Sequence, residues 1–106
     1  MGYYTNFVLV HDGGEDQTPA IKTLLESISG YEFDDELSVY GVKWYDWPND
    51  MTELSRSYPY ILFTLEGVGE ESPDLWRAYF KRGKYQVCQA KITFDEFDET
   101  KLKDHE

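Results

Sequence analysis

Hydrophobic and polar positions alternate most clearly in the second half of the chain. Three segments there carry an apolar residue at about every second position, which is the pattern of a strand with one buried face. Turn-forming and acidic residues separate them, so we predict three consecutive β-strands joined by an acidic loop and a tight turn. In order, these pieces are Tyr60–Glu66, the loop Gly67–Pro73, Asp74–Phe80, the turn Lys81–Gly83 and Tyr85–Phe94.

The turn Lys81–Gly83 allows two registers for the strands around it. A two-residue turn would set Trp76 opposite Gln89, whereas a three-residue loop with a left-handed Gly83 would set Trp76 opposite Cys88. We favour the three-residue loop, because it pairs apolar with apolar residues and places glycine where a positive φ is needed. Cys88 would then be a buried, inert thiol. The residues expected to share its face are Trp76, Phe80, Ala90, Ile92 and Phe94.

The first half of the chain predicts a strand, a helix and a second strand. Both faces of Tyr3–Val10 carry apolar residues, which is typical of a central strand covered at least partly on both sides. Helical spacing of apolar residues follows, with Thr18 as the expected N-cap and Gly30 as the stop. The acidic connection Tyr31–Glu36 is expected to be exposed, and Leu37–Tyr45 is rich in strand-forming residues.

Two further features complete the predicted order. Gly41 inside the second strand indicates a bulge or a close backbone approach. A second helix is expected over Asp46–Ser57, capped either by Asp46 or by Asp50. The order is thus β-α-β-α-β-β-β, which predicts an α+β fold. We expect one domain over residues 1–106, a mixed, mostly antiparallel sheet with both helices packed on one face, and an acidic tail from residue 95 that forms a short helix near Glu99 or frays.

Composition narrows the range of functions. The chain has 106 residues and a formal charge of −11, with 21 acidic residues against 10 Lys and Arg. This charge opposes direct nucleic-acid binding, which depends on cationic contacts to phosphate, and it favours docking on a basic surface. One cysteine, no apolar run of membrane-spanning length and no signal-like start predict a cytoplasmic protein without membrane attachment.

Candidate chemistry is sparse. Glu66, Glu70, Glu71 and Asp74 could converge on a divalent cation as in a metal-dependent hydrolase, but their spacing matches no known calcium loop, and a solvated acidic loop is the preferred interpretation. The glycines of Gly67–Gly69 lack the helix and the lysine of a phosphate loop. His11 has no nucleophile beside it and is interpreted as a surface loop residue. We therefore assign no catalytic residue, no metal and no cofactor.

Aromatic residues make up 17% of the chain, more than a core of this size can hold. Their densest cluster is Tyr40, Trp44, Tyr45 and Trp47. We expect at least two of these to be core residues, while Trp47 and a neighbour protrude at the start of the second helix as anchors for a partner protein. The predicted partner-binding residues are Tyr45, Trp47, Glu66, Glu70, Glu71 and Asp74.

Acidic residues gather in four segments, at 12–16, 32–36, 66–74 and 95–106. If these segments share one face, they would present a phosphate-like stripe of carboxylates. Such a stripe would allow the protein to occupy the nucleic-acid site of a DNA-binding enzyme.

The stretch KWYDWPNDMTELSRSYPYILFTLEGVGEESPDLWRAYFKRGKYQVCQAKITFDEFD resembles small acidic proteins encoded by bacteriophages and prophages, and the opening MGYYTNF is similar to their start. The most specific part is LEGVGEES followed by DLWRAYFK and GK. Pro73 stands where such proteins usually have glycine, which stiffens the loop. The resemblance implies the cytoplasm of an infected bacterium; it carries no catalytic residues, because no activity is established for the group.

These observations together predict a non-enzymatic phage or prophage accessory protein. It would bind and inhibit a host protein with a basic surface, such as a nucleic-acid-binding defence factor of the restriction or CRISPR type. Three alternatives remain open: an immunity protein that neutralises a basic nuclease toxin, a metal-dependent hydrolase using the loop from Glu66 to Asp74, and a small virion or assembly component. The oligomeric state is not predicted.

Overall fold

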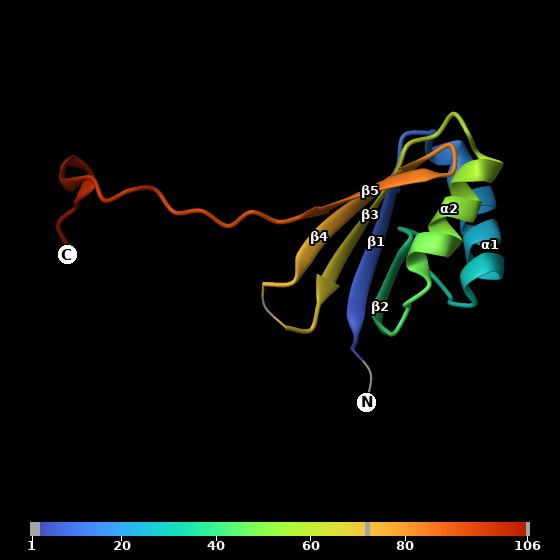
Figure 1. The fold of residues 1–106 in the computed structure, drawn as a ribbon, viewed down its shortest axis with the longest axis horizontal. Helices are drawn as coiled ribbons and strands as arrows, with labels where there is room; N and C mark the ends of the chain where they lie inside the picture. Colours follow the sequence, from blue (N-terminus) through green and yellow to red (C-terminus); the bar gives the residue numbers. More distant parts are fainter. Residues whose placement is uncertain (1–2, 72, 106) are drawn as a thin grey trace.

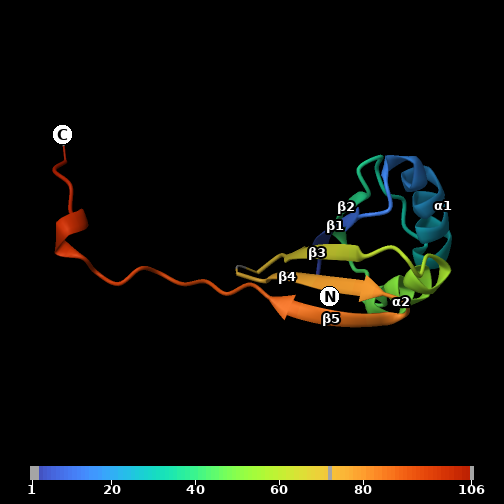
Figure 2. The same ribbon diagram turned by 90° about the horizontal axis from the view of Figure 1, so that it is seen from above.

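The computed structural model contains one open sheet of five strands in the order β2-β1-β3-β4-β5 (Figure 1). It describes residues 3–71 and 73–105, so the ends of the expected domain and Ser72 of the acidic loop lie outside the described residues. Both helices cover the same face of the sheet (Figure 2). The elements are β1 (Thr5–His11), α1 (Thr18–Ser29), β2 (Ser38–Val42), α2 (Trp47–Ser57), β3 (Phe63–Gly69), β4 (Leu75–Lys81) and β5 (Lys84–Gln89).

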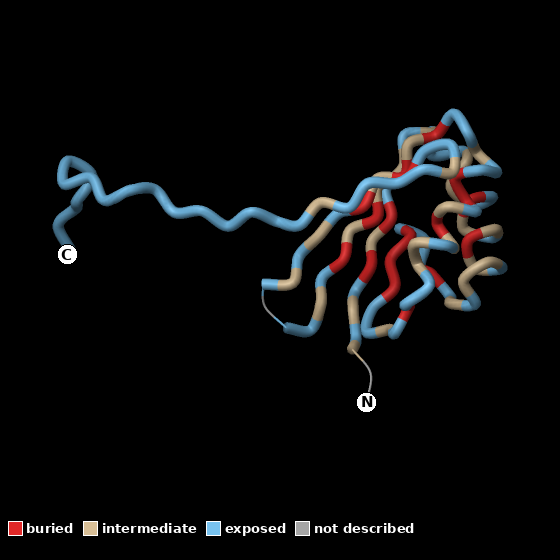
Figure 3. The backbone as a smooth tube through the Cα atoms, viewed as in Figure 1, coloured by how far each residue is buried: buried red, intermediate tan, exposed pale blue. Residues whose placement is uncertain are grey.

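The predicted α+β class and the order β-α-β-α-β-β-β are confirmed. All four strand pairings are antiparallel, so the sheet is not mixed as we expected. Buried positions occur along β1, β2, β3 and β4 and along both helices (Figure 3). The fully buried large side chains of this core are Phe7, Ile21, Leu25, Met51, Leu54, Phe63, Leu65 and Phe80.

The outer face of the sheet is open to solvent. On β1, Val10 is 52% exposed, and Tyr4 just before the strand is 45% exposed. The expectation that this strand is covered on both faces is therefore wrong for its outer face, because α1 and α2 both lie on the other side (Figure 2).

The expected irregularity at Gly41 is confirmed as a bulge on β2. Thr5 pairs with Val42 and Phe7 with Val39, so two steps along β1 match three along β2. Gly41 has a positive φ, in the left-handed region that glycine adopts without the steric cost of a Cβ. Its N–H donates to Oδ1 of Asn6 at 2.7 Å, so the residue displaced from the ladder still has a partner.

The β4–β5 hairpin has the two-residue turn, so our preferred three-residue loop is wrong. Lys81 pairs with Lys84 and Trp76 with Gln89. Arg82 and Gly83 both have positive φ values. A type I′ turn requires this at its two central residues, and its geometry matches the twist of the strands. The turn therefore holds Arg82 in a left-handed backbone conformation, which is sterically unfavourable for a residue with a Cβ.

This register also reverses the predicted faces of β5. Cys88 lies opposite Arg77 on the outer face and is half-buried, instead of facing the core with Trp76 and Phe80. Ala90 makes the last contact with β4, where its N–H donates to the carbonyl of Leu75 at 2.9 Å. The strand ends far short of the predicted Phe94, because β4, its partner, begins at Leu75.

The chain beyond β5 extends away from the sheet, and every described residue from Gln89 onward is exposed (Figure 3). Within it lies one turn of 3₁₀ helix, Glu99–Lys101, close to the predicted short helix. Asp98 precedes this turn, and its side chain accepts a hydrogen bond from the N–H of Thr100. Hydrogen bonds from Thr100 lower the pKa of the Asp98 carboxyl.

Helix boundaries differ from the predictions in small ways, and neither Asp46 nor Asp50 caps α2 through its side chain as we expected. Thr18 is the first residue of α1 and does not cap it; its hydroxyl lies 2.9 Å from Nε2 of His11. Gly30 ends α1 as predicted, with a left-handed backbone and its N–H donating to the carbonyl of Glu26. Asp46 occupies the N-cap position of α2, while the Asp50 carboxylate accepts from Nε1 of Trp44 at 2.7 Å and is not the cap.

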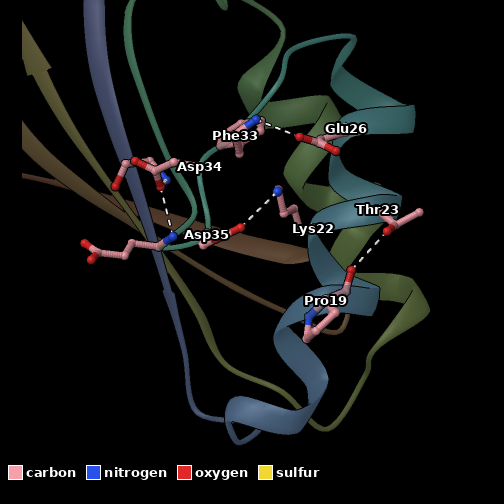
Figure 4. A network of polar contacts seen from close by, with 9 residues as sticks. Pro19, Lys22, Thr23, Glu26, Phe33, Asp34 and Asp35 are labelled. Carbon is pink, nitrogen blue, oxygen red and sulfur yellow. Dashed lines mark hydrogen bonds and ion pairs between the residues drawn. The ribbon is translucent and has the colours of Figure 1, made fainter.

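Polar contacts fix the acidic connection between α1 and β2 (Figure 4). Glu26 accepts a hydrogen bond from the N–H of Phe33 at 2.8 Å, and Lys22 forms an ion pair with Asp35 at 3.3 Å. Oδ1 of Asp34 accepts from two backbone N–H groups ahead of it, those of Glu36 and Ser38. The acids of this segment are exposed as predicted, but several of them already hold the connection in place.

A buried serine connects α2 to the β4–β5 turn. Oγ of Ser55 accepts from the N–H of Gly83 and donates to the carbonyl of Thr52, each at 2.8 Å. Replacing Ser55 with alanine leaves the Gly83 N–H without this acceptor, so we expect a loss of about 1–2 kcal/mol in the free energy of unfolding. Urea denaturation measures the loss. Ser57→Ala, on an exposed position of the same helix, is the control, and equal effects of the two changes would contradict the prediction.

Candidate functional site

The most developed site lies at the end of the sheet where β1 begins and β3 ends, and Tyr3 connects its parts. The hydroxyl of Tyr3 donates to Oδ2 of Asp74 at 2.6 Å, and it accepts from the N–H of Glu71 at 3.2 Å. The N–H of Tyr3 donates to the hydroxyl oxygen of Tyr45 at 2.7 Å. One residue therefore joins the acidic loop to the aromatic segment before α2.

Two glycines of β3 make room for this arrangement. A Cβ on Gly67 would overlap the indole ring of Trp76, and a Cβ on Gly69 would overlap both the Asp74 carboxylate and the Tyr3 hydroxyl. Neither glycine has a positive φ, so glycine is required here for space and not for backbone conformation. We predicted these positions as a loop; they continue β3 and form the floor of the site.

An aromatic pocket opens above this floor, with a volume of about 220 Å³. Trp47 and Trp76 stack beside it with ring centroids 4.5 Å apart and an interplanar angle of 22°, an arrangement that aromatic pairs favour. Its lining residues are Tyr3, Thr5, Phe7, Trp44, Tyr45, Trp47, Asp74, Trp76, Val87 and Gln89.

The Tyr3–Asp74 hydrogen bond has an electrostatic consequence. Because the neutral phenol donates to a carboxylate, ionising it would break the bond and bring two negative charges together. The hydrogen bond to Asp74 therefore raises the pKa of Tyr3 above its ordinary value, and the N–H of Glu71 opposes the rise only in part. Tyr3 thus remains a proton donor at neutral pH.

The structure brings most of the predicted partner-binding residues together. Tyr45 is 60% exposed, whereas Trp47 is half-buried by its stack on Trp76. Asp74 lines the pocket, and Glu71 lines an adjoining hollow with Tyr3 and Asp74.

Of the other two predicted acids, Glu70 lies beside this site and Glu66 lies on the outer face of the sheet. Oε1 of Glu70 accepts from the N–H of Tyr4 at 3.0 Å, which keeps Glu70 beside the site. Glu66 is not part of it: the side chain pairs with Nε of Arg77 at 2.7 Å on the outer face. The hydrogen bond to Glu66 raises the pKa of Arg77 above its ordinary value. The strand alternation of β3, which places Glu66 and Gly67 on opposite faces, explains the separation.

The carboxylates of this region do not converge. Among residues 3–71 and 73–105, no group of three or more His, Cys, Asp or Glu side chains is arranged to hold a metal ion. His11, the other candidate for chemistry, accepts the N–H of Gly13 on Nδ1 at 3.1 Å, which leaves Nε2 to donate to Thr18. The histidine is thereby half-buried at the end of β1, where it ties the following loop to α1.

The acidic segments do not form one stripe. Thr5 pairs with Gly69 and His11 with Phe63, so residues 12–16 follow one end of the β1–β3 pair, while Glu70 and Glu71 follow the other. The whole length of β1 therefore separates these two acidic segments. Residues 32–36 lie beside α1 on the β2 side (Figure 4). The acids of the β3–β4 loop adjoin Tyr3 and the exposed ring of Tyr45, while those of the tail flank the exposed rings of Phe94 and Phe97.

Sequence reasoning missed Tyr3, Trp76 and the two glycines as site residues. From the sequence, we interpreted Tyr3 as an ordinary strand residue and Trp76 as a core residue. One signal was available: Gly67 and Gly69 stand two apart directly after an alternating strand, so they share a face if the strand continues. Two small residues on one face indicate large side chains from the neighbouring strand lying across it.

Searches with the chain against protein-family models, characterised proteins and solved structures gave no match. No helix in the described part of the chain is long and apolar enough to cross a membrane.

Proposed function

We propose that this chain is a non-enzymatic binding protein that docks on a basic surface of another protein through the sheet end around Tyr3. The observation that carries the proposal is the meeting of an exposed aromatic residue, Tyr45, with the acids Glu70, Glu71 and Asp74 at one end of the sheet. Among the described residues none of these three acids forms an ion pair. Aromatic anchors beside charged groups are typical of protein interaction sites.

In the phage setting that the resemblance implies, the basic partner is a host protein, and binding inhibits it. A nucleic-acid-binding defence protein fits best, because such proteins carry basic surfaces to hold phosphates. The separation of the acidic segments narrows the proposal: the protein would cover part of the partner's basic surface with one acidic loop, and not imitate a continuous run of phosphates.

A comparison of two charge-reversal variants tests the proposal. Glu70→Lys with Glu71→Lys changes the proposed site, and Glu15→Lys with Asp16→Lys makes the same change of net charge at the other end of the sheet. Tagged proteins are used to capture partners from a lysate of the bacterial host, and affinity for the recovered protein is measured at several salt concentrations. We expect the site variant to bind at least about tenfold more weakly, because it places like charges across the interface.

The control variant is expected to retain affinity within about threefold, since its charges lie outside the contact. Equal losses in the two variants would mean that only overall charge matters, which would contradict the proposed site. Capture of no protein by the unchanged chain, or binding that ignores both salt and the Glu70–Glu71 reversal, would contradict the proposed function.

A further inference from the structure

The aromatic pocket combines features that a general docking surface does not need. Six of its lining residues are aromatic, one is an acid, Asp74, and none is a lysine or arginine. Asp74 forms no ion pair within the described residues, and its contact in the pocket wall is the Tyr3 hydroxyl on Oδ2. An acidic group in an aromatic-lined cavity favours a cationic ligand.

We infer that this pocket receives one arginine side chain of a partner protein, with the guanidinium group paired to the Asp74 carboxylate. The inference rests on the proposed function and specifies the chemistry of the same site. Arginine is preferred over lysine because its planar, weakly hydrated guanidinium packs against aromatic rings and donates in a fork that matches a carboxylate.

The size of the pocket agrees with one side chain. Its volume is about 220 Å³, which is roughly that of seven water molecules at the density of the liquid. An arginine side chain has about seven non-hydrogen atoms beyond Cα. Its aliphatic part would lie among Trp47, Trp76 and Val87, which line the same cavity as Asp74.

Other ligand classes fit less well. An anion would be repelled by Asp74 and by Glu71, which lines the adjoining hollow beyond Tyr3. An apolar side chain would remove water from the Asp74 carboxylate and leave it with the Tyr3 hydroxyl as its one partner from the pocket wall, which is costly for a charged group. A guanidinium satisfies the carboxylate and the aromatic lining together.

A pair of small probes tests the inference without the unknown partner. N-acetyl-arginine amide and N-acetyl-citrulline amide have nearly the same shape, but only the first carries a charge. Indole N–H signals of the full chain are followed by NMR as each probe is added. We expect the arginine probe to shift the signals of Trp47 and Trp76 with a Kd of about 1 mM, as befits a ligand of this size, and the citrulline probe to bind at least about tenfold more weakly.

Asp74→Asn is the decisive variant, because the asparagine carbonyl can still accept the hydrogen bond from Tyr3 while the charge is lost. It should bind both probes equally weakly. Asp16→Asn, the same chemical change at the far end of the sheet, should leave the preference for arginine unchanged. Equal binding of the two probes by the unchanged chain, absence of any indole shift, or tighter binding of N-acetyl-lysine amide would overturn the inference.

The outcomes also separate the inference from the proposed function. If the arginine probe binds through Asp74 but no basic protein is captured, the pocket assignment stands and the proposed function fails. If a basic protein is captured through Glu70 and Glu71 but the probe does not bind, the proposed function stands and the arginine pocket is wrong.

Discussion

Replacing Trp44 with alanine is expected to lower the free energy of unfolding by about 3–5 kcal/mol, the cost of removing a large buried aromatic side chain. Trp44 is 3% exposed and makes edge-to-face contacts with Phe7 and Phe33, at centroid distances of 5.1 and 5.7 Å. Small domains have a total stability of about 5–15 kcal/mol, so this loss would be a substantial fraction of the stability of the chain. Urea denaturation followed by circular dichroism measures the change.

Two further variants separate the contributions to this loss. Trp44→Phe keeps most of the buried ring but removes the indole N–H that donates to Asp50, so we expect a cost of about 1–3 kcal/mol. Tyr40→Ala removes an exposed aromatic side chain of β2, beside Gly41, and should change stability by less than about 0.5 kcal/mol. A loss below about 1 kcal/mol for Trp44→Ala would contradict the prediction, because it would mean that the packing of Trp44 against Phe7 and Phe33 contributes little to stability.

Gly67→Ala is the second change for which we expect a large loss of stability, because the added methyl group has no space. The new Cβ would overlap the indole of Trp76, so the ring must leave its place between β3 and Trp47. Overpacking of this kind costs about 1–3 kcal/mol. The same movement would change the shape of the aromatic pocket. Tryptophan fluorescence should therefore change together with the urea midpoint.

A double-mutant cycle isolates this clash. In a Trp76→Leu background the smaller side chain leaves space for the methyl group, so Gly67→Ala should cost much less than in the original chain. Val68→Ala, on the outer face of the same strand, controls for a change in strand propensity. If Gly67→Ala is equally costly in both backgrounds, the glycine is needed for some reason other than the ring above it.

Much of the fold could be predicted, because periodicity and turn residues are local signals. The stop at Gly30 and the bulge at Gly41 follow from residue types that favour particular backbone conformations. The hairpin register could not be chosen in this way. The pairing of apolar residues favoured one register, but the turn adopted a type I′ geometry that required a positive φ at Arg82, and this moved Cys88 to the other face.

The site was harder to predict because its parts are far apart in the sequence. Tyr45 and Asp74 could be proposed separately from aromatic and acidic composition. Their meeting depends on Tyr3, which lies 71 positions before Asp74 and 42 before Tyr45. Nothing local in the sequence distinguishes Tyr3 from the other residues of the predicted strand Tyr3–Val10. Strand order decides which ends of the sheet adjoin, and a single sequence does not fix strand order.

The outward position of Cys88 has a practical consequence for measurement. It is the single cysteine of the chain, and it lines a groove on the outer face together with Tyr79 and Ala90. A maleimide fluorophore or a nitroxide attached there would sit on the side of the sheet opposite the helices and the aromatic pocket. Such a label would report on binding at the pocket from the opposite face of the sheet, without competing with the ligand for space.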